Sequence, residues 1–217
     1  MVKTPKDSSH EPVPAEAARL EGLWAGEFGD AYIARNIEAG AGRDRFWAAL
    51  FERYPVSSVL EVGCNVGANL QWLVPLLGSS RVHGVDVNEQ ALTILRRRFP
   101  GVRAIISPAR SLPFEDGSMD LVFTSGVLIH QPDSALRDVM GELVRVAQAF
   151  VLAIEYHADE DVEVPYRGQR GALFKRNYAG LYQSYFPELE LLEGGFLGRD
   201  DGWDDATWCI FRKSPVH

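Results

Sequence analysis

Two glycines and one acidic residue form a pattern that suits chemistry on a bound ligand. Gly63 and Gly67 lie in a turn after one short apolar segment, and Asp86 follows the next such segment. Glycines let a ligand lie against the backbone and leave amide groups free at a helix start. A carboxylate after the second segment accepts hydrogen bonds from ribose hydroxyls. Asn65 stands where a GxGxxG fingerprint has its second glycine, which argues against NAD and FAD. Without a ligand, the glycines would only form a tight turn and Asp86 would cap a helix.

The residues around this turn resemble the S-adenosylmethionine (SAM) site of class I methyltransferases. The resemblance rests on E-x-G-x-x-x-G beginning at Glu61, on Asp86, and on the segment 112–123, which is similar to the stretch before the fourth strand of many small-molecule methyltransferases. It implies SAM as the cofactor and a supporting role for Glu61 beneath the loop and near the methionine amino group.

One position departs from that pattern. Those enzymes often carry an acidic residue shortly before Phe114 that binds the adenine amino group, and this chain has Pro108 there. The backbone near Ala109 and Arg110 is therefore expected to contact adenine.

Other stretches resemble the methylases associated with pseudaminic acid biosynthesis. They are 24–32 with Arg35 and Asn36, 124–130, Glu155 and Tyr156 with 164–168, 173–180, and 204–208. The resemblance runs from about Leu23 to the C-terminus and implies an enzyme of small-molecule or sugar metabolism, but it does not fix the acceptor. Asn177-Tyr178 stands where that family has Asp-Phe. Together with the glycine turn and Asp86, this resemblance implies a set of residues that contact the cofactor. They are Trp24, Phe28, Tyr32, Arg35, Glu61, Gly63, Cys64, Asn65, Gly67, Asp86, Val87, Ala109, Arg110, Ser125 and Gly126.

Aromatic residues gather in segments expected near the cofactor. Their ring faces attract a sulfonium by cation-π interaction, worth about 0.5 to 2 kcal/mol each. The alternative for each ring is an ordinary place in the core. The residues are Trp24, Phe28, Tyr32, Tyr156, Tyr166 and Tyr178.

His130 is the candidate general base, because it follows the fourth predicted strand and an unperturbed histidine titrates near neutral pH. The alternative is a structural histidine that caps the next helix. Tyr156, Tyr178 and Asn177 complete the candidate catalytic set. Tyr166 and Arg167 are the candidate substrate-binding residues, since arginine suits bidentate carboxylate recognition; a solvated loop position is the alternative for Arg167.

Two further functions stay open. In the first, SAM is the only substrate and its own amino nitrogen attacks Cγ, which gives azetidine-2-carboxylate and methylthioadenosine. An enclosed pocket lined by tyrosines would suit this cyclase, and Asn177 and Tyr178 would hold the amine or the carboxylate. In the second, the chain is a SAM-binding subunit without catalysis.

The elements that position these residues alternate between short apolar strands and helical periods. Predicted strands at 59–62, 82–85, 102–106, 120–124, 150–154, 188–194 and 206–213 alternate with helices at 67–77, 89–99, 133–147 and 173–186. This order predicts an α/β fold with a seven-stranded, mostly parallel sheet and an antiparallel edge strand. The resemblance described above implies that it is the Rossmann-like fold of class I methyltransferases. Residues 1–16 read as a disordered leader, 17–54 as an N-terminal cap of two helices, and 55–217 as the SAM-binding domain.

Composition narrows the partners. The chain has 217 residues, 46% hydrophobic, and a formal net charge of -8, which argues against a nucleic-acid or anionic-membrane surface and favours a small-molecule substrate. Two distant cysteines and five histidines match no metal-ligand spacing, so no metal is expected. We expect a cytoplasmic protein, since no signal peptide or membrane span is evident. The oligomeric state stays open.

Overall fold

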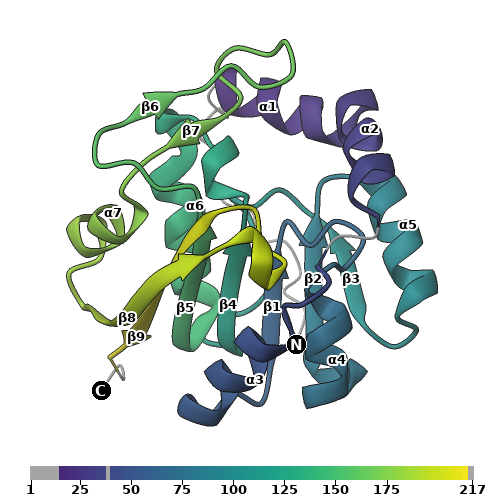
Figure 1. Cartoon of the computed structure of the whole chain (residues 1–217), viewed down its shortest axis with the longest axis vertical. Coiled ribbons are helices and arrows are strands. Elements are labelled where there is room, and N and C mark those ends of the chain that lie inside the picture. The colour runs from purple at the N-terminus through teal and green to yellow at the C-terminus, as the bar shows by residue number, and fades with distance from the viewer. Residues whose placement is uncertain (1–14, 38–39, 215–217) are drawn as a thin grey trace.

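A seven-stranded sheet forms the centre of the protein. The computed structural model describes residues 15–37 and 40–214, and its strands run in the order β3-β2-β1-β4-β5-β9-β8 (Figure 1). The strands are β1 (Val59–Val62), β2 (Val82–Asp86), β3 (Arg103–Ile106), β4 (Met119–Ser125), β5 (Ala147–Glu155), β8 (Leu189–Leu197) and β9 (Ala206–Lys213). Strands β1 to β5 pair in parallel, and β9 is antiparallel to both β5 and β8. The predicted α/β fold and its antiparallel pair at one edge are confirmed.

Helices cover both faces of the sheet. Strand β1 is buried along its whole length, as expected for a parallel strand between two helical layers. One core contains Val62 of β1 and Met140 of α6, and the other contains Trp47 of α3 and Leu92 of α5. The helices of these layers are α3 (Asp44–Arg53), α4 (Leu70–Leu77), α5 (Glu89–Arg98), α6 (Asp133–Val146) and α7 (Tyr178–Tyr185).

The cap consists of two helices, α1 (Ala15–Ala25) and α2 (Glu27–Asn36), drawn in purple at the top of Figure 1. Gly26 separates them with an extended backbone, so residues 17–54 hold three helices where two were expected. The third, α3, packs on a sheet face, because Trp47 is fully buried with its ring centroid 4.8 Å from that of Phe123. Of the expected leader, residues 15 and 16 belong to α1, and residues 1–14 lie outside the described residues.

Two predicted helices are shorter than expected. Helix α4 begins at Leu70 instead of residue 67, since the preceding residues form the glycine turn. Helix α7 begins at Tyr178 instead of residue 173, because Phe174–Lys175 (β7) pairs with Val162–Glu163 (β6) in a small second sheet. Single 3-10 turns lie at Ser79–Arg81, Leu128–His130 and Arg199–Asp201.

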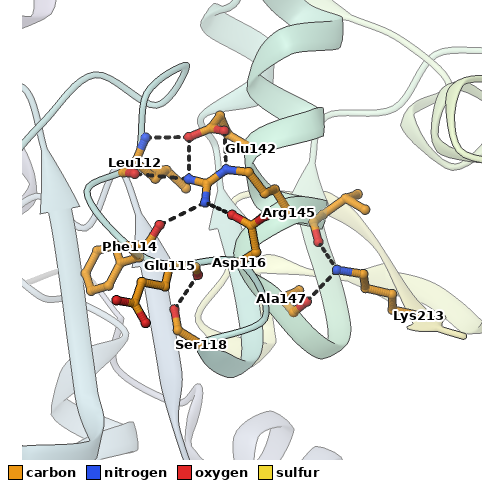
Figure 2. A network of polar contacts seen from close by, with 10 residues as sticks. Leu112, Phe114, Glu115, Asp116, Ser118, Glu142, Arg145, Ala147 and Lys213 are labelled. Carbon is orange, nitrogen blue, oxygen red and sulfur yellow. Dashed lines mark hydrogen bonds and ion pairs between the residues drawn. The ribbon is translucent and has the colours of Figure 1, made fainter. Parts of the chain in front are cut away.

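Arg145 fixes the segment that leads into β4 (Figure 2). Its guanidinium donates to the backbone oxygens of Leu112 and Phe114, at 3.1 and 2.8 Å, and pairs with Asp116 at 2.7 Å and Glu142 at 2.6 Å. Glu142 in turn accepts from the backbone nitrogen of Leu112 at 2.6 Å. These charge-assisted bonds hold the segment to α6. The segment 112–123 therefore has a structural role in positioning β4.

Candidate active site

The turn after β1 opens the ligand edge of the sheet. The backbone nitrogens of Gly63 and Cys64 both donate to Val85 O, at 2.8 and 3.0 Å, which ties the turn to β2. Gly63 has a φ of +75°, and a Cβ there would lie 2.3 Å from Cγ2 of Val127. A side chain is therefore excluded at this position by backbone conformation and by contact. Asn65 also adopts a left-handed φ, of +47°.

Asp86 lies at the end of β2 beside this turn. Its Oδ2 accepts from the backbone nitrogen of Asn65 at 2.8 Å, and its Oδ1 accepts from that of Asn88 at 2.9 Å. Burial raises its pKa, and the backbone hydrogen bonds oppose that rise. Each carboxylate oxygen accepts more than one hydrogen bond, so both keep capacity for a ligand's hydroxyls.

Glu61, Asn69 and Arg43 form a buried polar chain under the turn. Oε1 of Glu61 accepts from Nδ2 of Asn69 at 2.6 Å, and Oδ1 of Asn69 accepts from Nη1 of Arg43 at 2.8 Å. Oε2 of Glu61 is buried and has no partner. Burial raises the pKa of Glu61 to about 8. An unpaired buried polar atom of this kind is expensive, so Oε2 of Glu61 is a candidate ligand contact.

These residues line a cavity of about 450 Å³ at the carboxyl ends of the parallel strands. Its volume falls in the range of small-molecule sites, and its place is the ligand edge of a doubly wound sheet. The cap supplies one wall, the turns after β1, β2, β3 and β4 another, and the residues before β9 a third. The lining includes Trp24, Tyr32, Arg43, Glu61, Gly63, Cys64, Asn65, Asp86, Val87, Asn88, Ala109, Ser125, Gly126, His130, Tyr156, Trp203 and Asp204.

Trp24 is the central ring of the cap wall. Its ring centroid lies 5.4 Å from that of Tyr32, 5.3 Å from Phe28, 6.4 Å from Tyr166 and 4.4 Å from His130. Trp24, Tyr32 and His130 line the cavity, but Phe28 and Tyr166 do not. The structure brings four of the predicted aromatic residues together, with Trp24 and Tyr32 in the cavity lining and Phe28 and Tyr166 packed behind them.

His130 is buried in its neutral form. Its Nδ1 lies 2.5 Å from Ala172 O, so Nδ1 carries the proton and Nε2 is left as an acceptor. Burial lowers its pKa to about 4. His130 does not cap α6, because the N-cap of that helix is Pro132. Its structural role is instead the hydrogen bond to the loop at Ala172.

Tyr156 and Asp204 form a pair at the opposite wall. The Tyr156 hydroxyl donates to Oδ2 of Asp204 at 2.5 Å. Burial and this carboxylate raise the pKa of Tyr156 well above its usual range, so Tyr156 acts through hydrogen bonds and does not ionise.

The structure places several expected site residues elsewhere. Asn177 caps α7 by accepting from Gly180 N at 2.9 Å, and the Tyr178 hydroxyl donates to Phe174 O at 3.1 Å. Both line a separate hollow of about 170 Å³. They therefore do not join His130 and Tyr156, and the expectation of one shared catalytic pocket is corrected for these two positions.

Four other expected residues also lie outside the cavity lining. Arg110 pairs with Glu21 of α1 at 2.7 Å, and Gly67 packs against the ring of Phe99. Arg35 and Arg167 are exposed, with their guanidinium groups 5.9 Å from the ring centroids of Tyr32 and Tyr166 respectively. Ala109 and Arg110 were both expected to contact adenine. Only Ala109 lines the cavity, so the expectation is changed for Arg110.

Arg43, Trp203 and Asp204 are site residues that sequence reasoning missed. Arg43 Nε donates to Gly202 O at 2.9 Å, and its guanidinium lies 4.2 Å from the Trp203 ring centroid. A Cβ on Gly202 would lie 1.7 Å from Ala41 O, so the backbone at Gly202 packs directly against the backbone at Ala41. No local motif indicates this contact, although Asp204 lies in a C-terminal stretch that resembles a known family.

Metal and membrane features are not found in the part of the chain that the structure describes. No group of three or more His, Cys, Asp or Glu residues there is arranged to hold a metal ion. None of the described helices is long and apolar enough to cross a membrane.

Comparison with known proteins shows what part of this chain is similar to. Residues 59–149 match a family model described as a methyltransferase domain. Methyltransferase GfsG of Streptomyces halstedii is 36% identical over 119 residues, which cover 50% of this chain and 40% of that protein. The chain thus spans less than half the length of this curated relative.

Solved structures share the fold of this chain. The 1,6-didemethyltoxoflavin-N1-methyltransferase of Burkholderia thailandensis, solved with 1,6-didemethyltoxoflavin and S-adenosylhomocysteine, matches with a TM-score of 0.72 and 18% identity over 94% of this chain and 92% of that one. Magnesium protoporphyrin IX methyltransferase of Synechocystis PCC 6803, solved with SAM, matches with a TM-score of 0.66 and 13% identity over 94% of this chain and 100% of that one. The cofactor expected from the sequence is thus the one bound in this neighbour.

Proposed function

We propose that this chain is a SAM-dependent enzyme that transfers the SAM methyl group to a small molecule. The observation that carries the proposal is one cavity that combines Asp86 at the end of β2, the unpartnered oxygen of Glu61 and the guanidinium of Arg43. Asp86 suits the ribose of SAM, Glu61 suits its ammonium group and Arg43 suits its carboxylate. When bound, SAM supplies an activated methyl group on a sulfonium.

The donor set of the cavity fits this cofactor. Oε2 of Glu61 needs a hydrogen-bond donor, and an ammonium group provides one. Arg43 keeps Nη2 for a carboxylate, because Nε and Nη1 are held by Gly202 O and Asn69. Asp86 retains acceptor capacity toward ribose hydroxyls. Trp24, Tyr32 and Tyr156 offer ring faces to a cation, worth about 0.5 to 2 kcal/mol each.

The rest of the cavity serves the acceptor. Proximity supplies most of the acceleration when the methyl group is already activated, so the walls need to orient the acceptor's lone pair. His130 Nε2 and the Tyr156 oxygen are the hydrogen-bond acceptors that would orient the methyl acceptor. The earlier resemblance to methylases associated with pseudaminic acid biosynthesis rests on sequence stretches alone, so it supports small-molecule chemistry without naming the acceptor.

The intramolecular cyclase is a second candidate. A cavity of about 450 Å³ is the size that a single drug-sized ligand fills, and SAM is itself such a ligand. A reaction that needs no second substrate fits this enclosure. Asn177 and Tyr178 no longer support it, since they lie at a different hollow.

One product analysis separates these functions. Purified protein is incubated with SAM alone and then with SAM plus candidate acceptors, and the nucleoside product is identified by mass spectrometry. We expect S-adenosylhomocysteine only when an acceptor is present. Methylthioadenosine and azetidine-2-carboxylate from SAM alone would instead establish the cyclase. SAM binding by calorimetry without either product would indicate a non-catalytic subunit.

A further inference from the structure

We propose that the methyl acceptor is a small amine, bound between Tyr156, Asp204 and His130. This inference rests on the proposed function, since it concerns the half of the same cavity that the cofactor contacts leave free. We assign the cofactor to the turns after β1 and β2, which leaves for the acceptor the lining contributed by the cap, the end of β5 and the residues before β9.

The free half presents hydrogen-bond acceptors. The Tyr156 hydroxyl uses its proton on Asp204, which leaves its oxygen lone pairs available. Asp204 offers carboxylate oxygens, and His130 offers Nε2, because Nδ1 donates to Ala172 O. A ligand that complements three acceptors must carry several N–H or O–H donors.

The charges of the cavity disfavour an anionic acceptor. Its described lining contains the acidic side chains of Glu21, Glu61, Asp86 and Asp204 and one basic side chain, Arg43. Two of the acidic groups have partners outside the lining, because Glu21 pairs with Arg110 at 2.7 Å and Asp204 lies 3.5 Å from Arg199. Arg43 is bound to Gly202 O and Asn69, and its guanidinium lies against the Trp203 ring. Once the cofactor's carboxylate is bound to Arg43, the described lining holds no further basic side chain for a carboxylate or a phosphate.

The site also favours nitrogen over oxygen as the nucleophile. A hydroxyl must lose its proton during transfer, and a buried neutral histidine whose pKa lies near 4 is a weak base for that step. An amine reacts in its neutral form, and the proton of its ammonium form leaves to water before the transfer, so the transfer itself needs no base. The lone pair of the neutral amine forms the bond to the methyl carbon, the carbon–sulfur bond breaks with its electron pair staying on sulfur, and the positive charge moves to nitrogen. The product leaves as the methylated ammonium.

Asp204 lies where that new charge needs stabilisation. A carboxylate and ring faces that attract the ammonium more strongly than the neutral amine lower the barrier, because they bind the transition state better than the substrate. The Tyr32 and Tyr156 rings line the same half of the cavity, and cation-π attraction adds to the effect.

The test uses three ring compounds of matched shape, namely benzylamine, benzyl alcohol and benzoate. Binding of each to protein saturated with S-adenosylhomocysteine is measured by calorimetry. We expect benzylamine to bind at least about tenfold more tightly than benzyl alcohol, and benzoate to bind least. Benzyl alcohol or benzoate binding as tightly as benzylamine would overturn the proposal.

A pair of neighbouring variants makes the test specific. Asp204→Asn keeps an acceptor for Tyr156 but removes the charge, and we expect it to weaken benzylamine binding about tenfold. Asp205→Asn is the matched control, because Asp205 also pairs with Arg199, at 2.9 Å, but lies outside the cavity lining. Equal effects of the two variants would contradict the inference. S-adenosylhomocysteine affinity should stay unchanged in both, and failure of the wild-type protein to bind it would instead contradict the proposed function.

Discussion

Nδ2 of Asn88 donates to Oδ1 of Asp30 across 2.8 Å, and so joins the ribose side of the cavity to helix α2. The same Nδ2 donates to Trp24 O at 3.1 Å, and the Asn88 backbone nitrogen donates to Asp86 at 2.9 Å. One residue, Asn88, therefore links the carboxylate expected to bind the cofactor, through its backbone, with both helices of the cap, through its side chain.

Replacing Asn88 should loosen the cap without unfolding α5. Oδ1 of Asn88 caps α5 by accepting from Ala91 N at 2.9 Å, and serine also caps helices. Asn88→Ser should therefore keep the helix and lose the bond to Asp30. We expect faster hydrogen exchange over residues 15–36 and SAM affinity about five- to tenfold lower. Asp30→Ala should give the same exchange pattern, and normal protection of the cap in both variants would contradict this link.

Removing the Asp86 carboxylate should weaken SAM binding. A hydrogen bond to a charged group is worth about 1.5 to 3 kcal/mol, so Asp86→Ala should lower SAM affinity by at least about tenfold in calorimetry. Asp120→Ala is the matched control, because Asp120 Oδ2 accepts from the backbone nitrogens of Ser57 and Ser58, at 2.8 and 3.1 Å, before β1 begins. The control should lower stability and leave affinity intact. Unchanged affinity in Asp86→Ala would remove this residue from the cofactor site.

Glu61 should make SAM binding pH-dependent. In the free protein its pKa is about 8, so the carboxyl is protonated at pH 7. An ammonium beside it favours the ionised form, so binding near pH 7 releases a proton from Glu61 and affinity rises as pH increases toward 8. Calorimetry in buffers of different ionisation enthalpy measures this release. Glu61→Gln should abolish it, and an equal release in the variant would assign the proton to another group.

His130 should contribute to acid denaturation. Its folded pKa of about 4 lies below the usual 6.5, so the unfolded chain binds more protons between these values and stability falls as pH falls from 6.5 to 4. The full difference amounts to about 3 kcal/mol. Urea unfolding at pH 7.5 and pH 4.5 should show a smaller loss in His130→Gln than in the wild type. The raised pKa values of Glu61 and Glu155 act in the opposite direction in both proteins, so the comparison isolates His130. An identical loss would show that His130 is not buried neutral.

Breaking the Arg145 network should affect stability alone. Arg145→Met removes a partly buried guanidinium that has four polar partners (Figure 2), and we expect a loss of about 2 kcal/mol in urea unfolding. Arg212→Met is the control, because its pair with Glu190 is exposed and such pairs contribute at most about 1 kcal/mol. S-adenosylhomocysteine affinity should not change in either variant. A marked loss of affinity in Arg145→Met would mean that the network also shapes the cavity.

The sequence was most informative for candidate site residues that lie at the end of a strand. Gly63 follows β1 directly and Asp86 is the last residue of β2, so a local pattern was enough to place them. Arg43 and Gly202 are brought together by folding across most of the chain, and no short pattern records such a contact. Asn177 and Tyr178 were misplaced for a related reason, since the loop before α7 forms its own small sheet and turns these residues toward a different hollow.

Strand β9 lies between β5 and β8 in the sheet although it follows both of them in the chain. The wall that contains Trp203 and Asp204 precedes it directly, so this wall cannot close until β9 has paired with β5. During synthesis the parallel strands emerge from the ribosome first, and the nascent chain then exposes an open sheet edge beside an incomplete cavity. A ligand can therefore stabilise the protein only after β9 has paired, and deletion of β9 should abolish ligand binding.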